Sequence, residues 1–474
     1  MAAASNTTGL PVIAFANRLP VRRVRSTWRL SDGGLVAALQ PAMTSRGGVW
    51  VGWDGGIETP GQVEGLEIEL RPVSLSRREV DSYYHGFANR TLWPLLHGLV
   101  EWPTFDRSWW DAYRAVNAHF AAADDPSVAG YRWVHDYHLL LLPELLRRAG
   151  STGGIGFFLH VPFPPPEVFS RLPWRTTVLE GMLGADIVSF HTARYRDNFL
   201  RTCRQLVDGA EIHGTSVQLA DGRVVRTAAH PISIDATNLA DRARQPGVNR
   251  ALAGLQKQFA DRRLLLGVDR LDYTKGIPER LRAIELLLEL RPDLRREITF
   301  VQVAVPSRGE IREYRELRAA VEQLVGRING RFTEPGLDVP VHYLYRGVTP
   351  DRLLAYYRAA EICLVTPLQD GMNLVAKEYV TVQHATDGAG VLVLSEFTGA
   401  VEELPQALPC NPFDLEGLAG TISLALELDE SDRRNRLAQM AATIHRHDVF
   451  AWLDDELKPA PRAASPRRST ARSR

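Results

Sequence analysis

Two cations stand close together in the second half of the chain, in the stretch GVDRLDYTKGIPER. An apolar run ends at Asp269, and Arg270 and Lys275 follow in a loop. A helix is expected to begin near Ile277 and Pro278, because proline suits a first helical turn. Two cations between a strand end and a helix N-terminus can bind a phosphate or a diphosphate. A solvated surface loop with a local Asp–Arg pair is the alternative interpretation.

A second candidate anion site lies in the stretch LVTPLQDGMNLVAKEYV, where Asp370 and Gly371 form a turn after an apolar run. The N–H groups that open the following helix can face a phosphate, and they belong to Met372, Asn373 and Leu374. Asp370 is placed to accept hydrogen bonds from sugar hydroxyls, and Glu378, further along the helix, is placed to reach a ribose. Alternatively, Asp370 is an N-cap and Glu378 a surface charge.

The first half offers arginine, glycine and aromatic residues near its first apolar run. Arg18 follows this run directly, and Gly33 and Gly34 precede an expected helix. A glycine there lets a ligand approach the backbone closely. Aromatic rings stack on sugar faces, and the motifs VWVGW and YYHGFANRTLWP supply Trp50, Trp53, Tyr84 and Trp93. Taken singly, each aromatic residue is more simply explained by core packing.

Four histidines lie near the ends of apolar runs: His135, His138, His160 and His191. The HDYH segment suggests a metal site, but the HxxxH pair and third clustered ligand of a zinc helix are absent from the sequence, so we predict no metal. The proline run VPFPPP follows His160 and holds it rigidly at a strand end. This favours a fixed role for His160 in a cleft.

Several common nucleotide-binding patterns are missing from the sequence. No GxxxxGK[ST] occurs, no GxGxxG follows the first apolar run, and no D-x-D triplet occurs. These absences argue against a P-loop enzyme, against a dinucleotide dehydrogenase and against the simplest carboxylate cage for a divalent metal. We therefore expect neither a cofactor nor a metal.

Apolar runs alternate with helical patterns along most of the chain. The runs occupy 12–16, 131–136, 155–161, 185–191, 263–269, 298–305, 361–367 and 390–395, and helical patterns occupy 275–291, 309–326, 350–360 and 372–386. This alternation predicts an α/β protein with two doubly wound parallel sheets, one in each half, joined by a crossover at 228–235. Sites in such folds lie at the carboxyl ends of the strands.

Composition narrows the class of protein further. The 474 residues are 45% hydrophobic and 24% charged, as in globular proteins of two or three domains. Net charge is zero, but residues 458–474 hold six basic residues and no acid, so we expect a disordered basic tail and a body without attraction for nucleic acid. No signal peptide or membrane span is apparent, and three cysteines suit a reducing compartment; together these features predict a cytoplasmic protein.

Together, these segments resemble glycosyltransferase family 20, the trehalose-6-phosphate synthase family. The matching motifs are NRLP, GGLV, YYxGFxNxTLWP, HDYHLL, GFFLHVPFPPPE, VDRLDYTKGIPER, PSRGE, GRINGRF and VTPLQDGMNLVAKEY. They run in order from about residue 12 to residue 452. The resemblance implies a GT-B fold, with two Rossmann-like domains facing across a cleft. We expect an acceptor domain at 1–235 and a donor domain at 236–457, whose last helix packs back on the first.

The resemblance also assigns roles to matching positions. It implies an acceptor site for glucose 6-phosphate made of Arg18, Trp53, Tyr84, Trp93, Asp136 and Arg308. It implies a donor site made of Gly33, Gly34, His160, Arg270, Lys275, Val348, Asp370, Gly371, Met372, Asn373, Leu374 and Glu378. The expected catalytic residues are His160, Asp136, Arg270, Lys275 and Asp370. Val348 departs from better-known members, which have phenylalanine near the donor base.

The implied reaction is retaining transfer of glucose from UDP- or GDP-glucose to glucose 6-phosphate, giving α,α-trehalose 6-phosphate. We expect front-face attack without metal or cofactor, and a homodimer or homotetramer, as in relatives. One alternative is a pseudo-glycosyltransferase that couples cyclitols, as validoxylamine phosphate synthases do. The other is a non-catalytic sensor of sugar phosphate. The basic tail is expected to be dispensable for activity.

Overall fold

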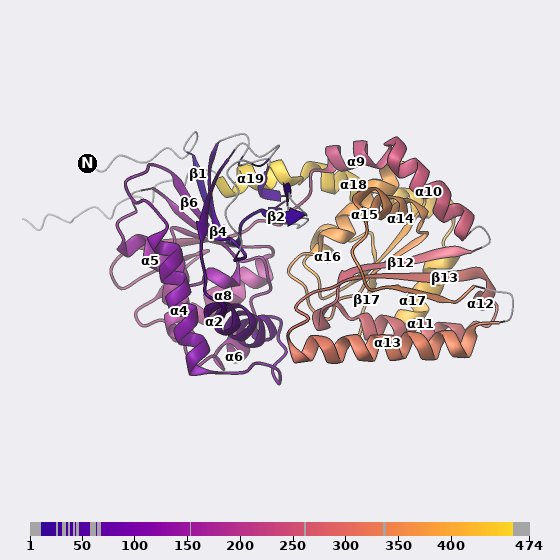
Figure 1. Cartoon of the computed structure of the whole chain (residues 1–474), viewed down its shortest axis with the longest axis horizontal. Coiled ribbons are helices and arrows are strands. Elements are labelled where there is room, and N and C mark those ends of the chain that lie inside the picture. Colours follow the sequence, from indigo (N-terminus) through magenta and orange to yellow (C-terminus); the bar gives the residue numbers. More distant parts are fainter. Residues whose placement is uncertain are drawn as a thin grey trace, which may run out of the picture.

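The computed structural model describes residues 11–24, 27–30, 35–36, 38–40, 43, 47–56, 63, 68–151, 153–259, 262–334 and 338–457. Within these ranges the strands form a nine-stranded sheet, a six-stranded sheet and a separate hairpin of β2 (Val21–Val24) and β3 (Thr27–Leu30). Figure 1 shows the two large sheets side by side along the long axis of the molecule. The chain therefore has two α/β halves, as the alternating pattern predicts.

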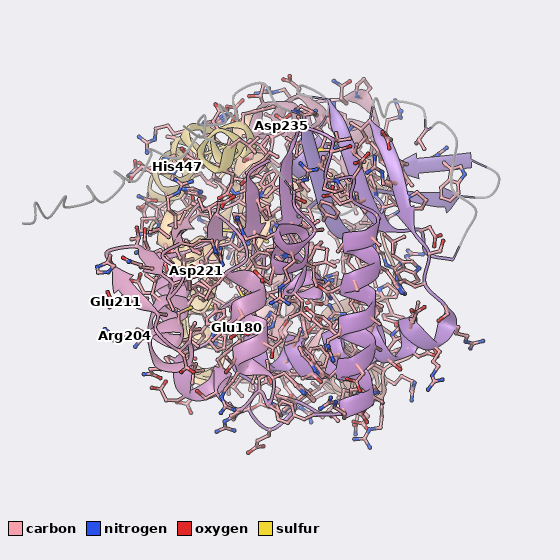
Figure 2. The ribbon with its side chains drawn as sticks, turned by 90° about the vertical axis from the view of Figure 1, so that its left-hand side faces the viewer. Glu180, Arg204, Glu211, Asp221, Asp235 and His447 are labelled. Atoms are coloured by element: carbon pink, nitrogen blue, oxygen red, sulfur yellow. The ribbon has the colours of Figure 1, made fainter. Side chains whose placement is uncertain are left out.

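The first sheet contains the strands of the first half in the order β5 (Glu69–Val73), β4 (Gly48–Trp53), β1 (Val12–Arg18), β6 (Tyr131–His135), β7 (Ile155–Phe158), β8 (Ile187–Phe190), β11 (Val224–Ala229), β10 (Ser216–Gln218) and β9 (Glu211–His213). Pairing is parallel from β5 to β11. At the far edge, β10 pairs antiparallel with β11 and with β9. Glu211 and Asp221, labelled in Figure 2, lie exposed on β9 and on the turn after β10.

The antiparallel edge strands differ from the expected all-parallel sheet. β9 and β10 are three residues long, and most of their residues are exposed or half-buried. Long apolar runs mark parallel strands that are buried on both faces. Short edge strands with a solvent-exposed face lack that signal, which explains why the sequence did not indicate them.

The second sheet contains β14 (Val341–Leu344), β13 (Ile298–Val305), β12 (Arg263–Arg270), β15 (Ile362–Val365), β16 (Val391–Ser395) and β17 (Leu408–Cys410), in that order. All its pairs are parallel. Successive residues of β12 enter different cores: Leu265 belongs to one apolar cluster, whereas Leu264 and Leu266 belong to another. Helices thus cover both faces of this sheet.

The helices of the first half are α2 (Arg77–Glu79), the π-helix η1 (Val80–Leu92), α3 (Trp93–Leu96), α4 (Arg107–Ala122), the 3₁₀ turn η2 (Tyr137–Leu139), α5 (Leu142–Arg148), α6 (Pro166–Phe169), α7 (Arg175–Met182) and α8 (Ala193–Leu206). Side-chain caps fix where the longer helices begin: Asp106 accepts from the N–H groups of Ser108 and Trp109 at the start of α4. Thr192 caps α8 in the same way.

The second half has α9 (Ala236–Ala243), α10 (Pro246–Gln258), the 3₁₀ turn η3 (Tyr273–Lys275), α11 (Ile277–Leu290), α12 (Leu294–Glu297), α13 (Arg312–Phe332), α14 (Pro350–Ala359), α15 (Leu374–Ala385), α16 (Ala400–Glu403), α17 (Leu415–Glu427), α18 (Glu430–Arg446) and α19 (Val449–Leu457). Helix α11 begins at Ile277 with Pro278 in its first turn, as predicted. No helix in the described ranges is long and apolar enough to cross a membrane.

The chain crosses between the two sheets twice. Residues 230–235 lead from β11 of the first sheet to α9 of the second half. Helix α19 then returns to the first sheet, where the ring of Trp452 lies 5.3 Å from the rings of Trp133 and Phe158. The last described helix is therefore part of the first half's core, as Figure 1 also shows.

The two crossing segments are bound to each other and to the second half. The Val449 N–H donates to the Ile234 carbonyl over 3.0 Å. The fully buried Lys377 donates to the Ile232 carbonyl over 2.9 Å and pairs with Glu403 at 2.5 Å. Because a buried ammonium without its partner is strongly destabilising, this ion pair ties the crossing firmly to α15 and α16.

Candidate active site

Three residues predicted for the site come from the carboxyl ends of neighbouring strands in the first sheet. Arg18 ends β1, Asp136 follows β6, and His160 lies two residues beyond β7. Because β6 pairs with both β1 and β7, these side chains share one edge of the sheet. Asp136 has a φ of 73°, and non-glycine residues with such backbone angles cluster at functional sites.

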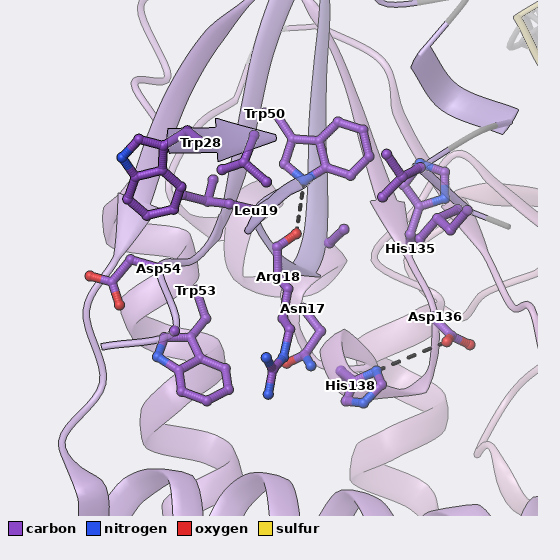
Figure 3. A pocket seen from close by; sticks show the side chains of 15 residues that line it. Asn17, Arg18, Leu19, Trp28, Trp50, Trp53, Asp54, His135, Asp136 and His138 are labelled. Carbon is purple, nitrogen blue, oxygen red and sulfur yellow. Dashed lines mark hydrogen bonds and ion pairs between the residues drawn. The ribbon is translucent and has the colours of Figure 1, made fainter. Parts of the chain in front are cut away.

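The Arg18 guanidinium lies against two aromatic rings. Its central carbon is 4.4 Å from the ring centroid of Trp53 and 5.3 Å from that of Tyr84. The adjoining cavity has a volume of about 430 Å³, which suits a small ligand. Figure 3 shows polar and aromatic side chains on its wall, among them Arg18, Trp50, Trp53, Asp136 and His138.

Tyr84 lies in a helix type that the sequence did not indicate, and Trp93 follows that helix. Residues Val80–Leu92 form the π-helix η1, and Trp93 begins α3 directly after it. Most π-helical stretches are single turns and they occur often at functional sites. Gly86 lies within this helix, where an added Cβ would lie 2.7 Å from the Trp109 indole of α4. The π-helix thus packs closely on α4, carries Tyr84 to the Arg18 guanidinium and is followed directly by Trp93.

Trp93 of the first half meets two arginines of the second half. The guanidinium carbon of Arg308 is 4.1 Å from its ring centroid, and that of Arg270 is 5.7 Å away. Burial raises the pKa of the nearby Tyr84 hydroxyl, but Arg308, Arg18 and Arg270 outweigh burial and hold this pKa below its usual value. Three cations from both halves therefore converge on one aromatic-lined place, as an anion site requires.

Asp272 lies at the centre of this cluster and was not among the predicted site residues. Its carboxylate accepts from Arg308 Nη1 at 3.1 Å, from the Tyr314 hydroxyl at 2.8 Å and from Trp93 Nε1 at 3.3 Å. Burial alone would raise the pKa of Asp272, yet the neighbouring cations, Arg308 foremost, lower it to about 2. Asp272 is the third residue of the RLDYTK motif, but only Arg270 and Lys275 of this motif were predicted as site residues.

Lys275 and Asp370, both predicted for the donor site, form a close ion pair. Lys275 Nζ lies 2.5 Å from Asp370 Oδ2, and both side chains are largely buried. Burial opposes ionisation of Asp370, but Lys275 outweighs it and holds the pKa of Asp370 below its usual range. Asn373 occupies the N-cap position of α15 and donates to Asp370 at 3.0 Å. The N-cap interpretation of Asp370 was therefore wrong.

The local Asp–Arg pair considered for the GVDRLDYTK loop is also not formed by Arg270. Asp269 instead pairs with Arg280 at 2.6 Å, and both side chains are buried. Gln302 donates to the same carboxylate at 3.1 Å. Arg270 is exposed at the end of β12, so its charge is available to a ligand in the cleft.

The turn that carries Asp370 touches the first half at His160. An added Cβ at Gly371 would lie 2.4 Å from the His160 carbonyl oxygen, and the Tyr195 hydroxyl donates to the Asp370 carbonyl at 2.9 Å. Burial and the neighbouring His135, whose Nδ1 is 3.1 Å from His160 Nε2, hold the pKa of His160 well below 6.5. His160 is therefore neutral at physiological pH.

Glu378 is half-buried, so the surface-charge interpretation was wrong. Its Oε2 accepts from the hydroxyl of Tyr357, which is fully buried, at 2.7 Å. Burial raises the pKa of Glu378. Met372 is buried, and Val348 is partly buried and packs against the apolar cluster that contains Met372.

The family model of glycosyltransferase family 20 matches residues 11–460. The chain belongs to glycosyltransferase family 20. It is 45% identical over 461 residues to trehalose-6-phosphate synthase of Mycobacterium avium (strain 104), with 93% of each chain covered. The family suggested by the sequence motifs is thereby confirmed.

Solved structures of similar proteins share the fold of this family 20 chain. The E. coli structure bound with UDP-2-fluoro glucose is 36% identical, with a TM-score of 0.86 over 95% of this chain and 100% of its own. The UDP-forming α,α-trehalose-phosphate synthase of Burkholderia xenovorans in complex with glucose-6-phosphate is 34% identical, with a TM-score of 0.85 over 94% and 98%. The predicted GT-B fold of two Rossmann-like halves is confirmed.

The structure of this family 20 chain brings most predicted residues into two adjoining clusters. Gly33 and Gly34 lie outside the described residues. The described residues contain no group of three or more His, Cys, Asp or Glu side chains able to hold a metal. Besides Asp272, sequence reasoning missed Tyr195 and Tyr357, whose hydroxyls hold Asp370 and Glu378. Tyr195 lies in α8 and Asp370 in the turn before α15, whereas Tyr357 lies in α14 and Glu378 in α15, and no motif links the members of either pair.

Proposed function

We propose that this chain transfers glucose, with retention, from a nucleoside diphosphate glucose to glucose 6-phosphate, giving α,α-trehalose 6-phosphate. The observation that carries the proposal is the meeting of two anion sites across the cleft. One contains Arg18 and Arg308 against aromatic walls, and the other contains Lys275 paired with Asp370. Named trehalose-6-phosphate synthases at 45% identity support this assignment.

The acceptor binds at the aromatic cluster in this proposal. Its phosphate lies among the cations around Trp93, and its sugar ring enters the cavity beside Trp53, where aromatic rings suit a sugar face. The residues assigned to the acceptor are Arg18, Trp53, Tyr84, Trp93, Asp136 and Arg308. The Burkholderia xenovorans relative, solved with glucose-6-phosphate, supports this ligand class.

The donor binds against the second half. Its diphosphate is held by Arg270, Lys275 and the N–H groups that open α15. Asp370 accepts from the glucose hydroxyls, and the half-buried Glu378 accepts from the ribose. The residues assigned to the donor are Gly33, Gly34, His160, Arg270, Lys275, Val348, Asp370, Gly371, Met372, Asn373, Leu374 and Glu378.

The chemistry follows from where negative charge develops. The anomeric hydroxyl oxygen of glucose 6-phosphate attacks the anomeric carbon of the donor from the face that the diphosphate leaves. The bond from this carbon to the phosphate oxygen breaks, and the departing phosphate takes the hydroxyl proton. Arg270 and Lys275 stabilise the charge on the leaving diphosphate. The neutral His160 and the carboxylate of Asp136 position the reacting sugars. Closure of the two halves excludes water from the site.

UDP-glucose is the donor we propose first. The structure of the E. coli relative is bound with UDP-2-fluoro glucose, and the Burkholderia xenovorans relative is UDP-forming. Val348 stands where better-known members have phenylalanine near the base. The choice of base is therefore tested by comparing activity with UDP-glucose, GDP-glucose and ADP-glucose.

Turnover of the purified chain tests the proposal. Glucose 6-phosphate is supplied with UDP-, GDP- or ADP-glucose in EDTA, and mass spectrometry detects the disaccharide phosphate. Product with one donor supports the transferase and identifies the base. Glucose 6-phosphate binding without turnover from any donor contradicts the transferase and indicates a sensor. Turnover confined to nucleotide-linked cyclitols indicates the cyclitol-coupling alternative.

Acceptor use is expected to rise with pH through a pKa near 6. Burial raises the pKa of Asp136 to about 6, so its carboxylate is about one-tenth ionised at pH 5 and almost fully ionised at pH 7.5. The ionised form accepts hydrogen bonds from sugar hydroxyls more strongly than the acid does. We therefore expect kcat/KM for glucose 6-phosphate to fall on acidification.

The Asp136→Asn variant separates this ionisation from that of the substrate phosphate, which also titrates near pH ~6. We expect a loss of about 10–100-fold in kcat/KM at pH 7.5 and a smaller loss at pH 5. We would measure kcat/KM for glucose 6-phosphate over pH 5–8 with the wild type and with Asp136→Asn. Identical profile shapes would show that only the substrate phosphate titrates.

We place this reaction in the cytoplasm. Cys203, Cys363 and Cys410 are all buried free thiols, as suits a reducing compartment. A homodimer or homotetramer remains the proposed assembly, and sedimentation velocity of the full chain measures it.

A further inference from the structure

A single buried carboxylate connects the two halves of the proposed acceptor site. Asp272 is fully buried on the loop after β12. Its Oδ1 accepts from Trp93 of the first half, and its Oδ2 accepts from Arg308 and Tyr314 of the second half. Through these bonds, one side chain sets the positions of both an aromatic wall and a cation.

These contacts hold Arg308 in an unfavourable backbone conformation and fix its guanidinium. Its backbone φ is 48° and its guanidinium lies over the Trp93 ring. The Tyr137 hydroxyl, 3.0 Å from Nη2, contacts it from the first half. Among the described residues, Arg308 Nε is buried and has no hydrogen-bond partner. A buried donor without a partner is costly, and the phosphate of an acceptor would satisfy it.

We propose that Asp272 is a positioning residue that holds Arg308 and Trp93 in place for the phosphate of glucose 6-phosphate. This inference rests on the proposed function. Asp272 acts through Arg308 and Trp93 and does not itself touch the phosphate, since two like charges would repel each other.

The carboxylate charge is needed, and the shape of the side chain alone does not suffice. An asparagine at this position keeps one oxygen acceptor, but its NH₂ group then faces the N–H groups of Arg308, which can only donate. Without the negative charge, Arg308 also loses its hydrogen-bonded, buried counter-ion beside the nearby Arg270 and Lys275. Arg308 would then turn away from the position in which it meets the phosphate.

A neighbouring ion pair provides a matched control. Asp269 and Arg280 form a second buried Asp–Arg pair, at 2.6 Å, three residues earlier in the same segment. Arg280 also donates to Thr366 and Gln302, inside the second half. Asp269→Asn therefore removes a comparable buried charge without changing a contact to the proposed acceptor site.

Binding titrations of the full chain without turnover test the inference. Calorimetry measures glucose 6-phosphate and, separately, UDP on the wild type, Asp272→Asn and Asp269→Asn. For Asp272→Asn we expect the Kd of glucose 6-phosphate to rise about 10–100-fold, while UDP binds at least as tightly as before, because a negative charge near Arg270 and Lys275 is gone. Asp269→Asn should lower the unfolding temperature and keep the Kd of glucose 6-phosphate, because its partner Arg280 contacts the donor-site residue Lys275 but no residue of the proposed acceptor site.

Two results would overturn the inference: unchanged glucose 6-phosphate binding by folded Asp272→Asn, or equal losses for both ligands. If Asp272→Asn alone does not fold, the double variant Trp93→Phe/Arg308→Met, which lacks the Trp93 and Arg308 donors to Asp272, is compared with the same variant carrying Asp272→Asn. Because Asp272 acts through Arg308 and Trp93, the two should bind glucose 6-phosphate alike, and a further tenfold loss on adding Asp272→Asn contradicts the proposal. A wild type that binds no glucose 6-phosphate would instead contradict the proposed function.

Discussion

Arg270→Met is expected to lower kcat by about 10²–10³, the loss seen when one preorganised donor to a developing anion is removed. Arg270 is exposed at the end of β12, and its guanidinium lies near Trp93 between the two proposed substrates. Negative charge on the leaving diphosphate grows in the transition state, so the loss should appear in kcat as well as in donor binding. Steady-state rates at saturating UDP-glucose measure it.

Arg282→Met is the control for this prediction. Arg282 is an exposed arginine of α11 that pairs with Glu279 on the same helix, so its removal should leave kcat unchanged. Because the Arg270 side chain is exposed and its contact with the Trp93 ring is long, at 5.7 Å to the centroid, its variant should unfold close to the wild-type temperature. A loss of less than tenfold in a folded Arg270→Met enzyme would show that the diphosphate is neutralised elsewhere.

Gly371→Ala should lower kcat by about 10²-fold, since a displacement of about 1 Å at the reacting groups is enough for such a loss. The added Cβ would lie 2.4 Å from the His160 carbonyl and 3.2 Å from the His191 ring. Both histidines belong to the first half, so the methyl group pushes the halves apart where the two sugars must meet. Kinetics and small-angle scattering with both substrate analogues measure the loss and the wider cleft.

Gly254→Ala in α10 controls for the substitution itself. An added Cβ there meets no atom within 4 Å, and alanine is the better helix former. Its kcat should equal that of the wild type. Wild-type kcat in Gly371→Ala would mean that the contact at His160 is not part of the reacting conformation.

The strands of the central sheets could be predicted from the sequence. The apolar run 298–305 is strand β13 residue for residue, and 263–269 differs from β12 by one residue. Strands buried on both faces read as continuous apolar runs, which few other elements do. The candidate site residue Arg270, at the end of such a strand, follows from the same pattern, whereas Asp136 was assigned its role through the family resemblance.

The polar contacts between the halves could not be predicted in this way. Trp93 and Asp272 are 179 residues apart in the chain, and their contact exists only because two separate sheets pack together. The π-helix at Val80–Leu92 also left no signal, because its residues satisfy a helical pattern without fixing the hydrogen-bond register. Motifs singled out candidate residues, but tertiary packing determines which of them touch.

The two crossing segments have a mechanical consequence. A single linker would let the halves swivel in any direction, but here the Val449 N–H bonds to Ile234, so two links run together. Two joined links define a single hinge axis. The halves can rotate about this axis, whereas rotation about other axes is resisted. Rotation about this axis would bring Gly371 back to His160 in the same alignment each time, so the closure proposed above needs only one rotational degree of freedom.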